Sequence, residues 1–166
     1  MRKVAFFFSL FVLIVMLVFE GVLRIQFKQD IGGHLKRAAD ANTVELASKE
    51  LRTALDNIER RGLMEGYTSV IYRTPDEDVG FWYQNLKASY DELKRLPNTA
   101  SMLEKSNMLI KLRETLLDDN EKGMSVTVPG GISRFPYNAL FGIVLFGAFI
   151  STVISLLFWW ELDRGW

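Results

Sequence analysis

The chain has no cysteine and only one histidine, His34, among its 166 residues. Without cysteine there is no disulfide, no thiolate metal ligand and no cysteine nucleophile. A single histidine without a ligand set or a nucleophile does not build a metal or acid–base site, because both need convergent partners. We therefore interpret His34 as a polar residue near a membrane boundary. The lack of cysteine does not decide the compartment, since a helical domain can be stable without disulfides.

The chain also lacks net charge, with 20 basic and 20 acidic side chains. Binding of a nucleic acid needs a basic surface for the phosphate backbone, and neither such a stripe nor a nucleic-acid motif is present. A polybasic lipid-binding segment is missing as well. The acidic run at residues 76–78 does not have the spacing of a calcium loop and suits the first turn of a helix. We expect no nucleic-acid partner, no cofactor and no metal site.

Two long apolar runs stand at the ends of the chain, at residues 4–23 and 138–160. A helix rises 1.5 Å per residue, so about 20 residues cross a hydrocarbon core of about 30 Å. Both runs reach that length and are predicted to be transmembrane helices. Aromatic residues that would mark the two boundaries of the second helix are Phe135, Tyr137, Trp159, Trp160 and Trp166.

The first run has a rival interpretation as a cleaved signal peptide, because it follows Arg2 and Lys3. No small-x-small cleavage site comes after it, so an uncleaved anchor is expected. Glu20 falls near the far end of this run. There it can be hydrated and can pair with Arg24 one helical turn later, so we do not assign it a function.

The charge of the chain ends predicts the orientation in the membrane. Arg2, Lys3 and the terminal amine outweigh the charges of residues 161–166, so both tails, 1–3 and 161–166, are predicted to be cytoplasmic. Two spans then place residues 24–134 outside the cytoplasm. A domain of this length is translocated regardless of its own charge. The expected location is the inner cell membrane, as a protein that crosses it twice.

Hydrophobic periodicity predicts three amphipathic helices in the middle domain. The pair Gly32 and Gly33 before them is expected to form a hinge as the chain leaves the membrane. Two β-rich pieces, residues 67–72 and 125–128, could pair as a minimal sheet. The fold class is thus mainly α, with two transmembrane helices flanking a small bundle. The expected helices are residues 35–61, closed by Gly62; a helix opened by Thr74, Pro75 and Glu77 that ends before Pro97; and a helix opened by Ser101 and Glu104 that ends before Asp118.

Three consecutive aromatic residues, Phe81, Trp82 and Tyr83, are the candidates for partner binding. Neighbouring residues of a helix point about 100° apart, so the three cannot all face one core. If Trp82 and Tyr83 pack in the bundle, Phe81 points toward the membrane, the β-rich pieces or another protein. Core packing explains most of this cluster, and a partner site is the functional alternative.

Small residues at four-residue spacing occur in both apolar runs, as Ala5 and Ser9 in the first and as Gly147, Ser151 and Ser155 in the second. Such residues let helix backbones approach closely in a membrane. In an antiparallel hairpin Ser9 and Ser155 would lie at similar depth and could pack on each other. Two alternatives stay open, chance and the docking of a helix from a partner complex.

The function expected from these features is a non-enzymatic, membrane-anchored protein-interaction module, an accessory or assembly subunit of a larger membrane complex. No nucleophile–base pair, phosphate loop or cofactor signature occurs, and two helices leave little room for a transport path. The alternative is an extracytoplasmic sensor, because a helical bundle between two spans resembles chemoreceptor-type input domains in topology, although residues 161–166 are too few for an output domain. An enzyme with an unremarkable site is a third class. The expected partners are the lipid bilayer and other membrane or extracytoplasmic proteins, and a homo-oligomer stays open.

Overall fold

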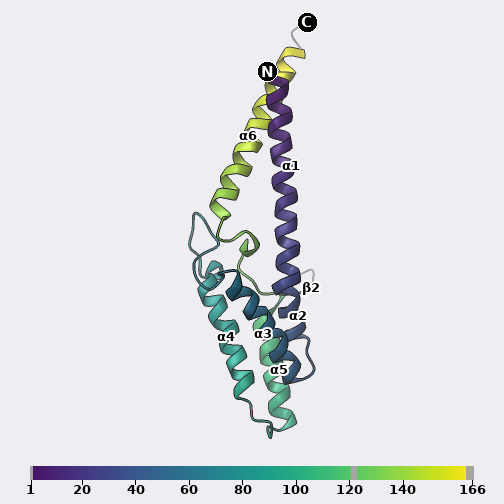
Figure 1. Ribbon diagram of the computed structural model, residues 1–166, viewed down its shortest axis with the longest axis vertical. Coiled ribbons are helices and arrows are strands. Elements are labelled where there is room, and N and C mark those ends of the chain that lie inside the picture. The colour runs from purple at the N-terminus through teal and green to yellow at the C-terminus, as the bar shows by residue number, and fades with distance from the viewer. Residues whose placement is uncertain (1, 121–122, 164–166) are drawn as a thin grey trace.

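The computed structural model describes residues 2–120 and 123–163. Figure 1 shows an elongated molecule with two long helices at one end and a helical bundle at the other. The long helices are α1 (Arg2–Phe27) and α6 (Asn138–Asp163), and the start of α1 and the end of α6 lie together, far from the bundle. Met1 and residues 164–166, which include Trp166, lie outside the described residues.

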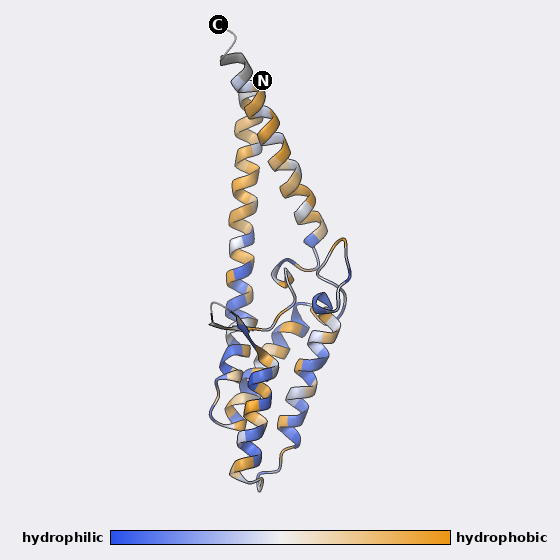
Figure 2. Ribbon diagram, turned by 180° about the vertical axis from the view of Figure 1, so that it is seen from behind, coloured by the Kyte–Doolittle hydropathy of each residue, from blue (hydrophilic) through white to orange (hydrophobic). Residues whose placement is uncertain are grey.

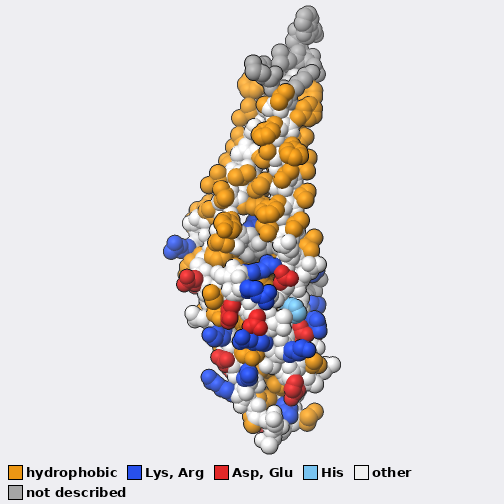
Figure 3. Space-filling view, viewed as in Figure 1, with side chains coloured by type: hydrophobic (Ala, Val, Ile, Leu, Met, Phe, Trp, Pro, Cys, Tyr) orange, Lys and Arg blue, Asp and Glu red, His pale blue; other side chains and the backbone are white. Residues whose placement is uncertain are grey.

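Both long helices are long and apolar enough to cross a membrane. Only 11% of the most apolar stretch of each is buried, whereas the core helix of a soluble protein would be mostly buried. Figures 2 and 3 show the contrast between this apolar helix pair and the bundle, on which charged side chains of both signs are interspersed. The architecture agrees with the predicted one at this level: mostly helical, with two candidate membrane spans.

The first long helix does not stop where the bundle begins. A π-helical turn, η1 (Lys28–Gly32), joins α1 to α2 (Gly33–Ala39), so the predicted boundary at residue 24 falls inside a continuous rod. The hinge predicted at Gly32 and Gly33 is therefore wrong. Both glycines have right-handed helical backbone angles, and the Gly33 N–H donates to the Lys28 carbonyl. A Cβ on Gly33 would lie 3.0 Å from that oxygen, so glycine here permits a tight π turn.

The helix predicted at residues 35–61 is two helices. After α2 the chain turns at residues 40–43, and α3 begins at its own cap, where the Thr43 hydroxyl accepts a hydrogen bond from the Leu46 N–H. α3 (Val44–Arg60) then ends before Gly62, which has the left-handed φ of 70° predicted for a helix-closing glycine. The bundle consequently has four helices where the sequence predicted three.

The other two bundle helices are α4 (Val79–Arg95) and α5 (Met102–Leu116). α3 packs against α2 and α4, and α5 packs against α2 and, less extensively, against α3 and α4. Burial of their apolar faces is the main stabilising term for such a bundle. The largest fully buried side chains are Ile31, Leu35, Leu51, Leu55, Ile58, Val79 and Leu116.

The helix starts follow the predicted caps in part. The capping box of α5 is confirmed, because the Ser101 hydroxyl accepts from the Glu104 N–H at 3.2 Å and the Glu104 carboxylate accepts from the Ser101 N–H at 2.7 Å. The start of α4 is later than predicted. Pro75–Glu77 forms a separate 3-10 turn, η2, and Asp78 caps α4 by accepting from the Phe81 N–H.

A small two-stranded sheet is present, but the pairing considered for residues 67–72 with residues 125–128 does not occur. Instead β1 (Leu117–Asn120) and β2 (Gly123–Val126) form an antiparallel hairpin directly after α5. Pairing neighbours in the sequence closes a smaller loop and costs less chain entropy than pairing distant segments. Residues 67–72 lie in the loop between α3 and α4, which is tied down by an isolated bridge from Tyr67 to Asp78.

Candidate functional site

The apolar helix pair is an antiparallel hairpin, in which the side chains of α6 that meet α1 recur at threes and fours along the helix. Small and aromatic side chains make these contacts, so the two backbones approach closely at the small ones. The observed pairs are Phe19 stacked on Phe141 at a ring distance of 6.3 Å, Ser9 accepting a 3.1 Å hydrogen bond from Thr152, and Phe6 edge-to-face with Trp159 at 5.7 Å.

The small residues predicted to pack the spans fall on different faces. Ser9 is buried against α6 and contacts Thr152. The α6 face toward α1 carries Ala148 and Thr152, one position further along the helix than the predicted Gly147 and Ser151, which are exposed. A Cβ added to Gly147 would meet nothing within 4 Å, so that position does not touch α1. The remaining predicted residues are Ser155, which is half-buried, and Ala5, which is exposed.

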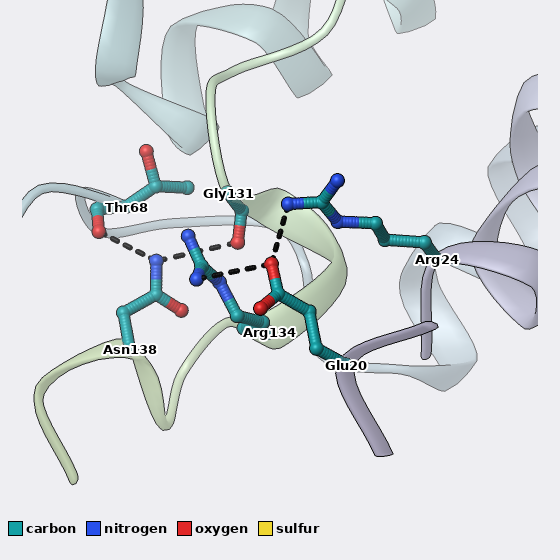
Figure 4. Close-up of polar contacts among 6 residues, drawn as sticks. All are labelled: Glu20, Arg24, Thr68, Gly131, Arg134 and Asn138. Atoms are coloured by element: carbon teal, nitrogen blue, oxygen red, sulfur yellow. Dashed lines mark hydrogen bonds and ion pairs between the residues drawn. The ribbon is translucent and has the colours of Figure 1, made fainter. Parts of the chain in front are cut away.

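A polar cluster lies at the junction between the helix pair and the bundle (Figure 4). Glu20 of α1 pairs with Arg24 one turn away, as predicted. The same carboxylate oxygen lies 3.3 Å from the Arg134 guanidinium of η3 (Ile132–Arg134), a turn in the connector to α6. Because Arg134 also covers the Phe141 ring at 5.6 Å, this second contact links α1, the connector and α6. The sequence offered no signal for it, since Arg134 is distant from Glu20 along the chain.

Asn138, the first residue of α6, holds two loops at the same junction. Its side-chain nitrogen donates to the Thr68 carbonyl at 2.6 Å and to the Gly131 carbonyl at 3.3 Å, as Figure 4 shows. The loop between α3 and α4 and the connector before α6 are thereby fixed beside the start of α6.

A groove of about 760 Å³ opens at this junction between α1, α6 and the connector. Its size is within the range of small-molecule sites, and most of its lining side chains are apolar. The polar residues of the lining are Arg61, Ser133, Arg134 and Tyr137, which include no carboxylate or imidazole that could act as a general base for Ser133. The lining of the groove is therefore mainly a surface for apolar contact.

His34 lies on α2 and faces the neighbouring helix α3. Its Nδ1 is 2.7 Å from a carboxylate oxygen of Glu50, and the other oxygen of Glu50 pairs with Arg37 at 2.7 Å. Glu50 is buried, so these two partners satisfy a carboxylate that would otherwise be costly to desolvate. The cluster joins α2 to α3. It was not predicted, because the sequence analysis treated residues 35–61 as one helix, and two parts of one helix cannot pack against each other.

The three aromatic candidates separate as the helical geometry requires. Trp82 is 7% exposed and its indole N–H donates to the Thr127 carbonyl at 2.9 Å. The Tyr83 hydroxyl donates to Glu59 at 2.8 Å, and partial burial, then this hydrogen bond and the charge of Glu59, raise the pKa of Tyr83. Phe81 is 62% exposed, so it is the one member of the three that points outward.

The helix α5 carries apolar side chains on two faces, of which the bundle buries one. Leu112 and Leu116 are in the core, whereas Met102, Leu103 and Ile110 are 83%, 71% and 52% exposed. Leu103 and Ile110 are two turns apart and share a face of the helix. Figure 1 places the start of α5 at the end of the bundle farthest from α1 and α6. We call Leu103 and Ile110 the outer face of α5, beside which Met102 is exposed at the helix start; this face was not among the predicted sites.

Within residues 2–120 and 123–163, no group of three histidine, aspartate or glutamate side chains is placed to hold a metal ion. The acidic run at residues 76–78 serves the start of α4. Glu77 accepts a 2.7 Å hydrogen bond from the Thr74 hydroxyl, and Asp78 is the N-cap. Two of the three carboxylates are thus engaged in local hydrogen bonds at the start of α4.

Comparison of the chain with protein-family models, with curated proteins and with solved structures finds no match in any of the three. Likeness to another protein therefore assigns neither a fold family nor a function. The features that bear on function are the apolar helix pair, its junction with the bundle, and the apolar side chains that the bundle leaves exposed.

Proposed function

We propose that the protein is a non-enzymatic, membrane-anchored protein-interaction module that serves as an accessory or assembly subunit of a larger membrane complex. The observation that supports this most is the outer face of α5, where Leu103 and Ile110 are both more than half exposed, with Met102 exposed beside them at the helix start. Exposed apolar side chains gathered in this way mark interaction surfaces. Because the outer face begins at the end of the bundle opposite α1 and α6, lipid is distant and the partner is a protein.

The anchor in this proposal is the hairpin of α1 and α6, with the bundle outside the cytoplasm. Arg2 and Lys3 at the start of α1 support that orientation by the positive-inside rule. Protease added to spheroplasts should then cut the bundle. Cutting that occurs only after the membrane is opened would contradict the orientation and place the partner in the cytoplasm.

Phe81 is proposed as a second contact, since it alone of the aromatic trio is directed outward. It lies in the first turn of α4, whereas the outer face of α5 starts at the opposite end of the bundle. A partner that covers both would extend along the bundle, and one that covers only Met102 and Leu103 would sit at its tip. Substituting Phe81 and Leu103 separately distinguishes the two arrangements.

The experiment is co-purification of the full-length protein from its native membrane in mild detergent. Glu at both Leu103 and Ile110 should weaken a stoichiometric partner's binding by about 30-fold, as expected for loss of a hot spot of about 2 kcal/mol. The matched control is Gln84→Glu, which adds charge at an exposed site on α4. Retention of the partner by the double variant, or no partner with the unsubstituted protein, would contradict the proposal.

A sensor is the second candidate, and one observation favours it. The rod of α1, η1 and α2 passes unbroken from the apolar pair into the bundle core, where Phe27, Ile31 and Leu35 are buried. A rigid element of this kind can carry a displacement between a domain and a membrane. A small molecule that raises the melting temperature of the full-length protein would favour the sensor, because a ligand that binds only the folded state stabilises it.

A further inference from the structure

The loop between α3 and α4 reaches the level at which α6 begins. Asn138, the first residue of α6, donates to the Thr68 carbonyl at 2.6 Å, which holds Thr68 beside that helix. Both views of the molecule agree, since the loop rises next to the near end of α6 in Figure 1 and its crest is hydrophobic in Figure 2. The loop therefore stands at the boundary of the apolar helix pair.

The crest of this loop presents three consecutive bulky residues outward: Val70, Ile71 and Tyr72 are 60%, 81% and 75% exposed. The neighbouring Thr68 is buried, and Val70, Ile71 and Tyr72 are the most exposed large hydrophobic residues of this loop. A turn orders it, because the Ser69 hydroxyl accepts a hydrogen bond from the Tyr72 N–H at 3.2 Å. We call Val70, Ile71 and Tyr72 the apolar crest.

The surroundings of the apolar crest are those of a membrane interface. Tyr137, just before α6, and Leu140, in its first turn, are also exposed, so the apolar surface of a candidate membrane span begins near the level of the crest. Arg73 follows the crest and lies over the Tyr67 ring at 5.4 Å. Tyrosine and arginine beside aliphatic residues suit the headgroup level of a bilayer. There the apolar part of each side chain can contact acyl chains while its polar tip contacts headgroups and water.

We propose that the apolar crest inserts into the bilayer leaflet on the bundle's side, with Ile71 among the upper acyl chains and Arg73 at the lipid phosphates. This inference rests on the proposed insertion of α1 and α6 and is independent of the protein partner. Lipid is the occupant that fits, because the crest shares the level of the start of α6 and is covered by no segment that the structure describes there. With the two helices it would form a third attachment to the membrane. That attachment would fix the tilt of the bundle and direct the outer face of α5 away from the membrane.

The test uses single cysteines in this cysteine-free chain, labelled with an environment-sensitive fluorophore in vesicles whose lipids carry bromine at a shallow or a deep acyl position. Ile71→Cys is the crest position, and Val70→Cys is a second one in case the first perturbs the loop. Ile143→Cys, exposed on α6, reports whether that helix is in the bilayer. Gln84→Cys, exposed on α4, reports a site in water.

The proposal predicts a blue-shifted emission at the crest positions and stronger quenching by shallow than by deep bromine. Ile143→Cys should be quenched more by deep bromine than the crest is, and Gln84→Cys by neither. Crest labels that behave like Gln84→Cys while Ile143→Cys is quenched would overturn the crest proposal alone. A blue shift without bromine quenching would show a protein over the crest and would overturn it as well. An unquenched Ile143→Cys would refute the insertion of α6, and the proposed anchor would fail together with the crest.

Discussion

Trp82 packs in the core of the bundle and also binds the segment that follows the β-hairpin. It projects from α4, is 7% exposed, and donates its indole N–H to the Thr127 carbonyl at 2.9 Å. Replacing Trp82 with Ala removes one of the largest buried surfaces of the domain and leaves a cavity, in addition to deleting that hydrogen bond. Such truncations destabilise proteins by about 3–5 kcal/mol.

The two contributions to that loss are separable. Trp82→Phe keeps most of the apolar volume and removes the indole donor, so the Thr127 carbonyl loses a hydrogen bond worth about 1 kcal/mol. Trp82→Ala removes both. The expected order of stability is therefore the unsubstituted protein, then Trp82→Phe, then Trp82→Ala, with the larger step between the last two.

Thermal unfolding of the full-length protein in detergent, followed by circular dichroism, measures the difference. For a domain of this size, about 3 kcal/mol lowers the melting temperature by at least about 10 °C. Phe81→Ala is the matched control, because the neighbouring ring is exposed and its loss should change stability little. Equal melting temperatures for Trp82→Ala and Phe81→Ala would refute the assignment of Trp82 to the core.

Three further predictions concern polar contacts. Glu59→Gln should lower the raised pKa of Tyr83, as followed by phenolate absorbance; in the unsubstituted protein this tyrosine's contribution to stability is present below pH 10.0 and is lost as pH rises through the folded pKa. An unchanged titration would show that Glu59 is not a cause of the shift. Cysteines at Ser9 and Thr152 should crosslink efficiently within one chain, since the two hydroxyl oxygens are 3.1 Å apart. Moving the second cysteine one residue back along α6 should abolish the crosslink, and equal yields would contradict the helix packing. Glu50→Gln should lower stability by about 1–3 kcal/mol in chemical denaturation, because the buried group loses its ion pair and charge-assisted hydrogen bonding. No loss would mean that the cluster is dispensable.

Local signals in the sequence predicted the parts of the fold that depend on local geometry. Ser101 and Glu104 form the expected capping box, Gly62 closes α3, and the two apolar runs form the two longest apolar helices. The break between α2 and α3 escaped prediction because residues 40–43 contain neither proline nor glycine, and the apolar periodicity passes through them.

The errors arose where distant segments decide the outcome. Gly32 and Gly33 remain helical because the rod packs into the bundle beside them, with Ile31 and Leu35 buried, whereas glycine by itself predicts a hinge. Strand pairing is the exception, because there the sequence analysis considered a distant partner for residues 125–128 and the structure pairs the first two of these with the strand just before them in the chain. Composition identified small residues in both spans, but Ala148 and Thr152 face α1 only because of how α6 is rotated.

The candidate site was predictable in one respect, the outward direction of Phe81 when Trp82 and Tyr83 pack inward. The outer face of α5 was within reach of the same reasoning. α5 holds more apolar residues than one buried stripe requires, and Leu103 and Ile110 are seven residues apart. Which of its two apolar faces is buried depends on α2, and that packing is absent from the local pattern.

Binding of a protein at the outer face of α5 is tested most directly by a photo-crosslinking amino acid placed at Leu103 in the full-length protein, irradiated in its native membrane. The prediction is one discrete crosslinked species with a second protein, reproduced from Ile110 and absent from Gln84 on the exposed side of α4. Crosslinking at Leu103 no stronger than at Gln84, in cells where the protein is intact and folded, would contradict it.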